Sequence, residues 1–439
     1  MKQTNFLKLL FMLAVLHFPI LASADNSGTC GENLTWTYNE STKTLTISGK
    51  GDMADYKAWN APWFDYISEI QTVIIEDGVT SIGEFAFYSF YYEYSNLTSV
   101  DIPNSVMNIG LYAFRGCSSL TSSLNISGNI GEEAFMGCTG LKSVSISGNV
   151  GDGAFRHCTG LENISINEGV ENIGPSAFLG CPMTTIHLPS TVTTIDAQAF
   201  AYCSCLSTIT VASGNKTFDS RDNCNAIIKT AENELIQGCK NTVIPNTVTS
   251  LGQASYMGVE IEDFIVPENI TTIGRTVFYE CPNLKTLIFG NSVTSIAGKA
   301  INKCPLLETI KIGSGLKSID DENILRCEGL KDLYLFANTI PQRTNQNYDK
   351  IYLFDKTPIS TATLHVPASL VDSYKATAPW SGFGNVVPLT EDDNLSGVSV
   401  VNSDTSFNTA TPVYNLSGQR LMVPQKGINI VNGKKVVVK

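Results

Sequence analysis

Histidine, basic residues and long apolar stretches are scarce in this sequence, and each scarcity removes a class of function. The chain has 29 Lys and Arg against 41 Asp and Glu, a net charge of −12. Nucleic acid is not expected as a partner, because binding to phosphates needs a basic face. After residue 24 no segment carries the roughly 20 apolar residues that a membrane-spanning helix needs. A membrane span is therefore not expected either.

Three histidines, His157, His187 and His365, lie dispersed after residue 24. The sequence contains no His-Glu-x-x-His pair, no Gly-rich phosphate loop and no Ser-His-Asp order. It has no Cys-x-x-Cys pair and no histidine cluster beside a cysteine, so no metal site is expected. These absences predict a protein that is not an enzyme and uses no cofactor. Scattered carboxylates leave open an extracellular hydrolase with a paired acid site.

The first 24 residues have the pattern of a secretory signal peptide. Lys2 and Lys8 are their only charges, an apolar run from Leu9 to Leu21 follows, and Ala22-Ser23-Ala24 offers a small-residue cleavage site. No cysteine stands at that site, so a lipid anchor is not expected there. Removing two lysines from 29 basic residues leaves 27 against 41 acidic ones, a net charge of −14. That balance favours solubility outside the cell.

A repeat of about 20 to 23 residues fills most of the chain. A clear copy runs from Ile109-Gly110 through Ala113-Phe114 and Cys117 to Leu120. The frame recurs at 130–141, 150–161, 173–181, 195–206, 273–284, 296–307 and 319–330, with an interrupted first copy at 82–97 and a copy near 251 that lacks both Phe and Cys. The period lies in the range of leucine-rich repeats.

Each part of the repeat carries a structural expectation. In the phrase after Leu97, alternation points Val100 and Ile102 inward and Ser99 and Asp101 outward. The glycine after each Ile suits a tight turn with positive φ. The Ala-Phe-x-x-Cys segment is too short for a full helix and is expected to form one helical or 3₁₀ turn. One repeat cannot bury its own apolar face, so neighbouring repeats are expected to stack.

These patterns predict a mainly β protein. The expected fold is a right-handed leucine-rich-repeat solenoid of about ten repeats, with parallel strands, short helical turns, a β N-terminal cap and a small β C-terminal tail. The expected boundaries are a signal peptide at 1–24, a cap at 25–75, the solenoid at 76–389, a linker at 390–410 and the tail at 411–439. Residues 212–245 interrupt the frame and are expected to form a variant double turn with a hairpin.

Eight of the twelve cysteines hold one position in the repeat. Stacked neighbours would lie about 5 Å apart, but parallel Cβ vectors make the torsion of a disulfide hard to reach. They are expected to be buried free thiols that act as small apolar side chains. Cys224 and Cys239 lie outside this ladder and flank the expected hairpin, so a disulfide between them is a hypothesis. The states of Cys30 and Cys205 stay open.

Two surfaces are candidates for ligand binding. Outward strand positions form a polar face that becomes more apolar toward the C-terminus. Its members singled out here are Asp101, His187, Ile265, Ile288 and Tyr334. The other surface is an insertion in the first repeat with five aromatic residues, which are Tyr88, Phe90, Tyr91, Tyr92 and Tyr94. Exposed aromatics anchor interfaces or stack on sugars. The alternatives are a merely solvated sheet face, and aromatics that pack against the cap and its tryptophans Trp59 and Trp63.

The repeat closely resembles the BspA-like leucine-rich-repeat family of bacterial surface proteins, over residues 30 to about 389. Cys30–Trp36 and Leu45–Met53 resemble the N-terminal cap of the family, Ala61–Trp63 its link into the first repeat, and Thr363–Pro367 its closing repeat. The resemblance implies a leucine-rich-repeat fold and surface adhesion, with extracellular-matrix or bacterial partners in some members. Ligands vary within the family, so no ligand-binding residue is carried over.

The tail carries a second resemblance. Val413–Arg420, Lys426–Val431 and Lys434–Lys439 resemble a β-rich sorting domain that directs outer-membrane secretion and surface attachment in some Gram-negative bacteria. The chain is therefore expected to be secreted or displayed on the outer membrane exterior of a Gram-negative bacterium. We expect a monomeric adhesin that binds an extracellular protein of the matrix or host surface, or a glycan. A glycan-binding accessory protein is the alternative function.

Overall fold

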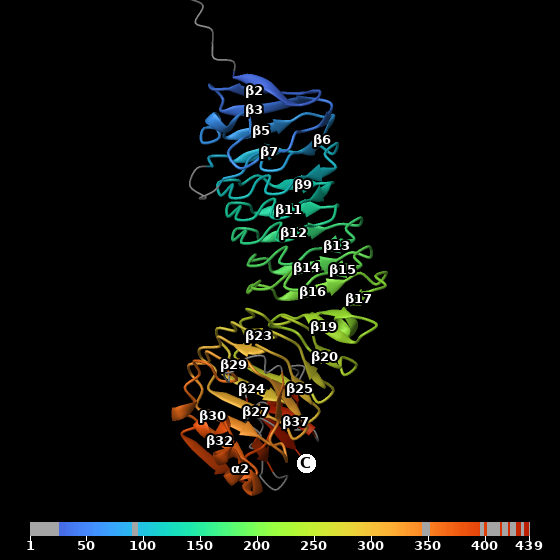
Figure 1. The fold of residues 1–439 in the computed structure, drawn as a ribbon. Helices are drawn as coiled ribbons and strands as arrows, with labels where there is room; N and C mark the ends of the chain where they lie inside the picture. Colours follow the sequence, from blue (N-terminus) through green and yellow to red (C-terminus); the bar gives the residue numbers. More distant parts are fainter. Residues whose placement is uncertain are drawn as a thin grey trace, which may run out of the picture. The chain divides into compact units, whose positions relative to one another are not determined.

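The computed structural model describes residues 26–89, 95–344 and 352–395, and the backbone of five strands between 399 and 438. The chain divides into two compact units, unit 1 with residues 1–200 and unit 2 with residues 201–439. Both are parallel β-solenoids with few helices, and together they hold about 13 turns (Figure 1). The predicted fold class is confirmed, and the predicted domain boundaries stay predictions.

Unit 1 contains two rows of short strands. The first row begins with three cap strands, β1 (Ser27–Gly31), β2 (Leu34–Asn39) and β3 (Thr44–Gly49). The strands that follow in this row are β5 (Thr72–Ile75), β7 (Ser99–Asp101), β9 (Leu124–Ile126), β11 (Ser143–Ile146), β12 (Asn163–Ile166) and β14 (Thr185–Leu188). The second row is β4 (Gly51–Asp52), β6 (Val79–Ile82), β8 (Asn108–Ile109), β10 (Asn129–Ile130), β13 (Asn172–Ile173) and β15 (Thr194–Ile195). Strands β1 to β3 pair antiparallel as a cap, and parallel pairing begins between β3 and β5.

Strand alternation follows the sequence pattern. In β11, Val144 and Ile146 are buried while Ser143 and Ser145 lie on the outer face. In β7, Val100 is buried and Asp101 is exposed, as predicted. This period of two places one face of every strand in the core and the other toward solvent.

The segment between Gly and Cys is not the single helical turn that the sequence predicts. Tyr112 and Gly116 both have positive φ, at 56° and 79°, and such left-handed residues interrupt a helix. The N–H of Phe114 donates to the carbonyl of Ala134 in the next repeat at 2.7 Å. The N–H of Gly116 donates likewise to Met136 at 2.8 Å. The segment is therefore a pair of turns whose backbone pairs with the neighbouring repeat.

The glycine after each Ile is required by close stacking, not by the positive φ that the sequence suggests. Gly131 is outside the set of glycines with positive φ. A Cβ atom there would lie 2.8 Å from the carbonyl oxygen of Ile109 and 2.9 Å from the carbonyl carbon of Gly110. The repeated glycine thus lets two backbones approach at this edge.

The core of unit 1 is a column of stacked aromatic rings. Trp63 begins it, 5.3 Å from the ring of Phe87, and its Nε1–H donates to the carbonyl of Ala86 at 2.8 Å. Successive rings then lie 4.9 to 5.5 Å apart with planes within 13° of parallel. The column comprises Phe87, Phe114, Phe135, Phe155, Phe178 and Phe200, all buried.

The cysteine ladder is buried and free, as predicted. Its thiols do more than fill space, because most of them donate to a backbone carbonyl of the preceding repeat, whereas Cys327 donates to Leu325 in its own repeat. The Sγ–H of Cys117 donates to Phe87 at 3.2 Å, and that of Cys158 to Phe135 at 3.1 Å. Burial raises the pKa of Cys117 and Cys158 to about 12. These residues are therefore neutral donors inside a dry core.

Unit 2 contains three sheets of the solenoid. The first has strands β17 (Phe218–Asp219), β18 (Ile227–Lys229), β19 (Glu234–Gln237), β20 (Ser250–Leu251), β22 (Thr272–Ile273), β25 (Ser295–Ile296), β28 (Ser318–Asp320) and β31 (Gln342–Thr344). The second has β21 (Asp263–Val266), β24 (Thr286–Phe289), β27 (Thr309–Ile312), β30 (Asp332–Leu335), β32 (Thr363–Val366) and β33 (Asn385–Pro388). The third has β23 (Phe278–Tyr279), β26 (Ile301–Asn302) and β29 (Ile324–Leu325).

The helical elements are short. They are η1 (Phe64–Tyr66) in unit 1, and η2 (Arg221–Asn223), η3 (Ile359–Thr361), η4 (Ala368–Leu370), α2 (Val371–Ala376) and η5 (Trp380–Gly382) in unit 2. Helix α2 directs Tyr374 inward, where its ring lies 5.6 Å from that of the buried Trp380. These aromatics close the apolar core at the C-terminal end of the second sheet.

The interruption at 212–245 forms the predicted hairpin. Strands β18 and β19 pair antiparallel, and β19 pairs parallel with β20 in the solenoid sheet. The disulfide hypothesised between Cys224 and Cys239 is not formed, and both residues are buried free thiols. The Sγ of Cys224 lies 3.7 Å from the Oγ of Ser220, whereas the Sγ–H of Cys239 donates to the carbonyl of Asn225 at 3.5 Å. The two thiols therefore face different partners.

The C-terminal strands form a mixed sheet of their own. They are β34 (Ser399–Val401), β35 (Val413–Tyr414), β36 (Arg420–Leu421), β37 (Gly427–Val431) and β38 (Lys434–Val438). Strands β37 and β38 pair antiparallel, and β34 pairs parallel with β38. The predicted signal peptide and four residues of the aromatic insertion, Phe90, Tyr91, Tyr92 and Tyr94, lie outside the described residues.

Candidate ligand-binding surface

The outer strand face of unit 1 is a mostly polar surface, on which the parallel strand register aligns equivalent side chains of neighbouring repeats. Parallel pairing aligns Ile74 with Asp101, and Ser145 with Ser165. Asp101 and His187 are both exposed on this face, in the orientation that the sequence predicts. From β5 to β14 the outward positions are Thr72, Ile74, Ser99, Asp101, Asn125, Ser143, Ser145, Asn163, Ser165, Thr185 and His187. None of them is Lys or Arg, so apart from Ile74 the face offers hydroxyl, amide, carboxylate and imidazole groups.

Hydrogen bonds between repeats hold part of this face in place. The Oγ–H of Ser143 donates to the Oγ of Ser123 at 2.7 Å. The Nδ2 of Asn167 donates to the Oγ of Ser145 at 2.9 Å. Side chains fixed in this way lose less conformational freedom when a ligand binds.

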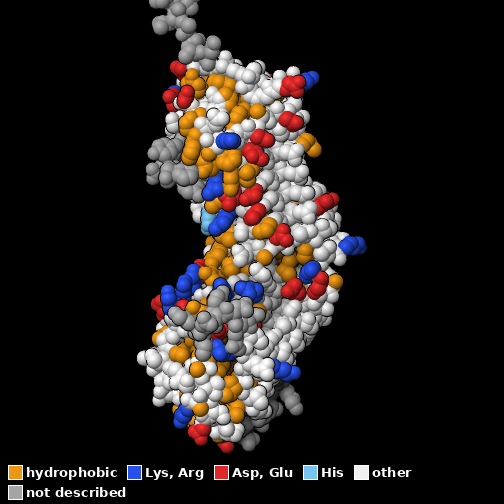
Figure 2. Space-filling model, in the orientation of Figure 1, with side chains coloured by type: hydrophobic (Ala, Val, Ile, Leu, Met, Phe, Trp, Pro, Cys, Tyr) orange, Lys and Arg blue, Asp and Glu red, His pale blue; other side chains and the backbone are white. Residues whose placement is uncertain are grey.

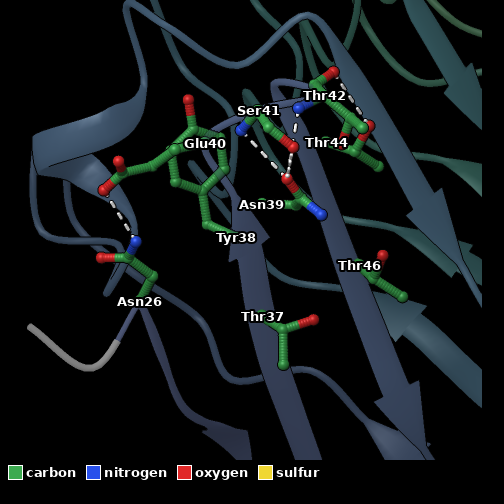
Figure 3. A pocket seen from close by; sticks show the side chains of 9 residues that line it. All are labelled: Asn26, Thr37, Tyr38, Asn39, Glu40, Ser41, Thr42, Thr44 and Thr46. Atoms are coloured by element: carbon green, nitrogen blue, oxygen red, sulfur yellow. Dashed lines mark hydrogen bonds between the residues drawn. The ribbon is translucent and has the colours of Figure 1, made fainter. Parts of the chain in front are cut away.

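The face continues into an open hollow of about 670 Å³ at the cap (Figure 3). Its lining is Asn26, Thr37, Tyr38, Asn39, Glu40, Ser41, Thr42, Thr44 and Thr46. The Oδ1 of Asn39 accepts hydrogen bonds from the backbone N–H and hydroxyl of Ser41, at 3.0 and 2.7 Å, and so fixes the β2–β3 turn. Glu40 is the single carboxylate of this lining, which does not fit the paired acids of a glycoside hydrolase.

A second surface lies on the turn side of the first repeats. The half-buried rings of Phe85 and Tyr112 have centroids 4.9 Å apart, and that of Tyr88 lies 5.4 Å from Phe85. The guanidinium of Arg115 lies 4.9 Å from the ring centre of Tyr112 and also pairs with Glu133 at 2.5 Å. Figure 2 shows hydrophobic side chains gathered over the cap and first turns of unit 1. The structure thus groups Tyr88 with aromatics that the sequence interpretation missed.

A sequence signal for the missed residues exists. Phe85 and Tyr112 occupy the first left-handed position of the turn, at φ 55° and 56°, where later copies have Glu133, Gly153 and Ser176. An aromatic residue in left-handed backbone costs roughly 1–2 kcal/mol. Aromatic residues at this position in two consecutive repeats, where later repeats have polar or small residues, are therefore the sequence signal of the surface cluster.

The outer face of unit 2 is only partly exposed. Ile265 on β21 is 38 % exposed, but Ile288, its partner in register on β24, is 3 % exposed. The prediction that Ile288 belongs to an open surface is therefore wrong. The chain after β33 contacts this row, because the Nζ of Lys311 on β27 donates to the carbonyl of Asn394 at 2.9 Å.

Tyr334 lies in this covered part of the face. It is half-buried, stacks on His365 with centroids 4.0 Å apart, and lies 4.9 Å from the Nζ of Lys311. The Nε2 of His365 lies 3.0 Å from the Oδ1 of Asp332. Burial raises the pKa of Tyr334, and Asp332 and Asp393 raise it further. Tyr334 is therefore engaged within the protein.

The repeat itself decides the family. Residues 59–152, 128–232 and 233–352 match the model described as the BspA type leucine rich repeat region, with six copies. This chain belongs to the BspA-type leucine-rich-repeat family. A comparison of the BspA-type chain with curated proteins gives no match.

Solved structures of other bacterial repeat proteins share this BspA-type fold. A leucine-rich cell surface protein from Faecalibacterium prausnitzii is 24% identical, with a TM-score of 0.53 over 83% of this chain and 95% of that one. The pneumococcal vaccine antigen PcpA is 16% identical, with a TM-score of 0.55 over 84% of this chain and 99% of that one. At such identities the likeness shows the fold alone.

The described part of this BspA-type chain offers neither a membrane-spanning helix nor a cluster of metal ligands. No helix there is long and apolar enough to cross a membrane. Within the same residues, no group of three or more His, Cys, Asp or Glu side chains could hold a metal ion.

Proposed function

We propose that this BspA-type protein is an exported binding protein, an adhesin that recognises host or bacterial macromolecules through its solenoid surface. The observation that carries the proposal is the outer strand face of unit 1. Its side chains repeat in register from strand to strand, stand exposed, and include Asp101 and His187. Hydrogen-bonding groups spread over many strands suit an extended partner that makes many weak contacts.

Three observations support the proposal that the protein is displayed outside the cell. The first 24 residues have the signal-peptide pattern, the tail resembles a sorting domain, and the similar protein of Faecalibacterium prausnitzii is described as a cell surface protein. We place this chain, as a monomer, on the outer membrane exterior of a Gram-negative bacterium or in its surroundings. The partner is an extracellular protein of the matrix or host surface, with a glycan as the alternative ligand.

The test is a binding assay with the mature protein against immobilised matrix proteins and a glycan array. Ser145→Arg combined with Ser165→Arg places two large cations on the outer face. We expect the best ligand of the unaltered protein to bind at least about 10-fold more weakly, because the two groups block neighbouring strands. Asn172→Arg on β13, an exposed strand of the other row, is the matched control. Equal binding by all three proteins would contradict the proposal for this face.

The aromatic cluster is a second candidate surface for the same function. Phe85, Tyr88 and Tyr112 lie together on the turn side, and the insertion next to them in sequence adds Tyr91 and Tyr92. Aromatic residues are enriched among the anchors of interfaces. Tyr91→Ser with Tyr92→Ser should weaken ligand binding while the melting temperature stays within about 2 °C. A lower melting temperature with intact binding would show instead that these rings pack structurally.

A further inference from the structure

The outer face of the second sheet in unit 2 changes from open to covered between two neighbouring strands. Register aligns Ile265 of β21, Ile288 of β24, Lys311 of β27 and Tyr334 of β30 in one row. Ile265 is 38 % exposed and Ile288 is 3 % exposed, although both are isoleucines on adjacent strands. Side-chain type cannot explain this difference, so it comes from the groups that surround the row, among them Lys311 in register with Ile288.

A built turn sends the chain back from the end of this sheet. The N–H of Leu389 still donates to the carbonyl of Val366 at 2.8 Å, as a continuation of β33 beside β32. The Oδ2 of Asp393 then accepts from the N–H and hydroxyl of Thr390 at 2.7 and 2.9 Å. The N–H of Asp393 donates to the carbonyl of Thr390 at 3.1 Å. These bonds close a tight reversal at residues 390–393.

The reversed chain is clamped three strands in from the sheet edge. In the strand order β27-β30-β32-β33, Lys311 on β27 donates its Nζ–H to the carbonyl of Asn394 at 2.9 Å. The same ammonium lies 4.9 Å from the ring centre of Tyr334. Burial lowers the pKa of Lys311, and the nearby carboxylate of Asp393 opposes that shift. A desolvated cation is stable only with partners, and here the ring and the segment provide them.

We propose that residues 389–395 form a strap, docked on the outer face of β24, β27 and β30 by Lys311 and Tyr334, which closes this part of unit 2 to external ligands. The strap joins the solenoid to the tail, so the state of the tail controls access to the Ile288–Tyr334 row. A pull or a cut in the tail that frees Asn394 opens an apolar and cationic strip beside Ile265. Its effect on ligand binding rests on the proposed function, whereas the docking does not.

The test uses the full mature chain and no ligand, so its failure is distinguishable from failure of the proposed function. Lys311→Met removes the ammonium and keeps the aliphatic stem. We expect the amides of Thr390 and Asp393 to exchange hydrogen about 10-fold faster or more, because a charge-assisted hydrogen bond is lost. Cleavage after Glu391 by a glutamate-specific protease should accelerate likewise. Lys285→Met, at an exposed ion pair with Glu262, is the matched control and should change neither rate.

A second variant keeps the test independent of the lysine. Asp393→Ala removes the acceptor that closes the reversal, and should accelerate cleavage after Glu391 as Lys311→Met does. The proposal is overturned if the unaltered protein is cleaved after Glu391 as fast as an unstructured peptide. It is equally overturned if both variants leave exchange and cleavage unchanged.

Discussion

Units 1 and 2 use the same repeat but fill its turn with different side chains. In unit 1 the ring position holds phenylalanine from Phe87 to Phe200, and the rings stack at 4.9 to 5.5 Å. In unit 2 the equivalent positions are Tyr256, Phe278, Ile301 and Ile324, and the last three lie in strands β23, β26 and β29. β-Branched residues favour extended backbone. The turn forms a third parallel sheet in unit 2, where Phe278 keeps the ring in β23 and isoleucine replaces it in β26 and β29.

The residue before the cysteine differs in part. Its φ is positive in both units, but Gly116, Gly137 and Gly180 hold it in unit 1 together with His157, whereas Glu280, Lys303 and Arg326 hold it in unit 2. A residue with a side chain costs roughly 1–2 kcal/mol there. In unit 2 an ion pair of Lys303 with Glu280 and the approach of Lys303 to the ring of Tyr279 at 5.0 Å offset part of that cost. The stacked rings are thus more regular in unit 1, whereas side-chain pairs accompany the residues at this position in unit 2.

The largest expected effect comes from breaking the ring column. Phe135→Ala should lower the free energy of unfolding of unit 1 by about 3–5 kcal/mol, because Phe135 is fully buried between two rings. Alkylation of thiols at increasing urea, followed by mass spectrometry, reads each unit separately. Cys138 should become reactive at lower urea than in the unaltered protein, while Cys304 in unit 2 should not change. Simultaneous loss of protection at both cysteines would contradict independent unfolding of the units.

The next effect tests close stacking of the backbones. Gly131→Ala should destabilise unit 1 by about 1–3 kcal/mol, since its Cβ would lie 2.8 Å from the carbonyl oxygen of Ile109. Gly298→Ala in unit 2 is the control, because nothing lies closer than 3.6 Å to its Cβ. That variant should be neutral or slightly stabilising. Equal destabilisation by both variants would remove the stacking explanation for the glycine.

The smallest effect concerns the ion pair of unit 2. Burial raises the pKa of Glu280, but hydrogen bonds from Lys303 and Tyr202 outweigh it, so the pKa lies below its ordinary value. A carboxylate with a lowered pKa contributes stability above its unfolded pKa of about 4.3, and this contribution is lost as pH falls through the folded value. Glu280→Gln should cost about 0.2–1 kcal/mol at pH 7 and less at pH 3. Denaturant unfolding at both pH values measures this, and an equal loss at both would exclude the ion pair as its origin.

Local pattern was sufficient to predict the strands, the buried phenylalanines and the free cysteines, because each depends on position within one repeat. The role of Gly131 was misjudged because its constraint is a distance between repeats, which one copy of the motif does not contain. Ile288 was placed on an open face because the segment that contacts its row is remote in sequence, since Lys311 and Asn394 are 83 positions apart. The contact between Phe85 and Tyr112 depends on the left-handed backbone conformation of both residues, which cannot be predicted from the residue types alone.

The thiol-to-carbonyl bonds described above also bear on how the buried cysteines stay free of disulfides. Most of these bonds join residues of adjacent repeats, such as Cys138 with Phe114, which are 24 positions apart. Loops of that length close in less than a millisecond, whereas disulfide formation takes seconds to hours. On these timescales the cysteines are buried before they can be oxidised to disulfides. A variant that folds more slowly, for example because its column of aromatic rings is broken, would therefore form non-native disulfides before its cysteines are buried.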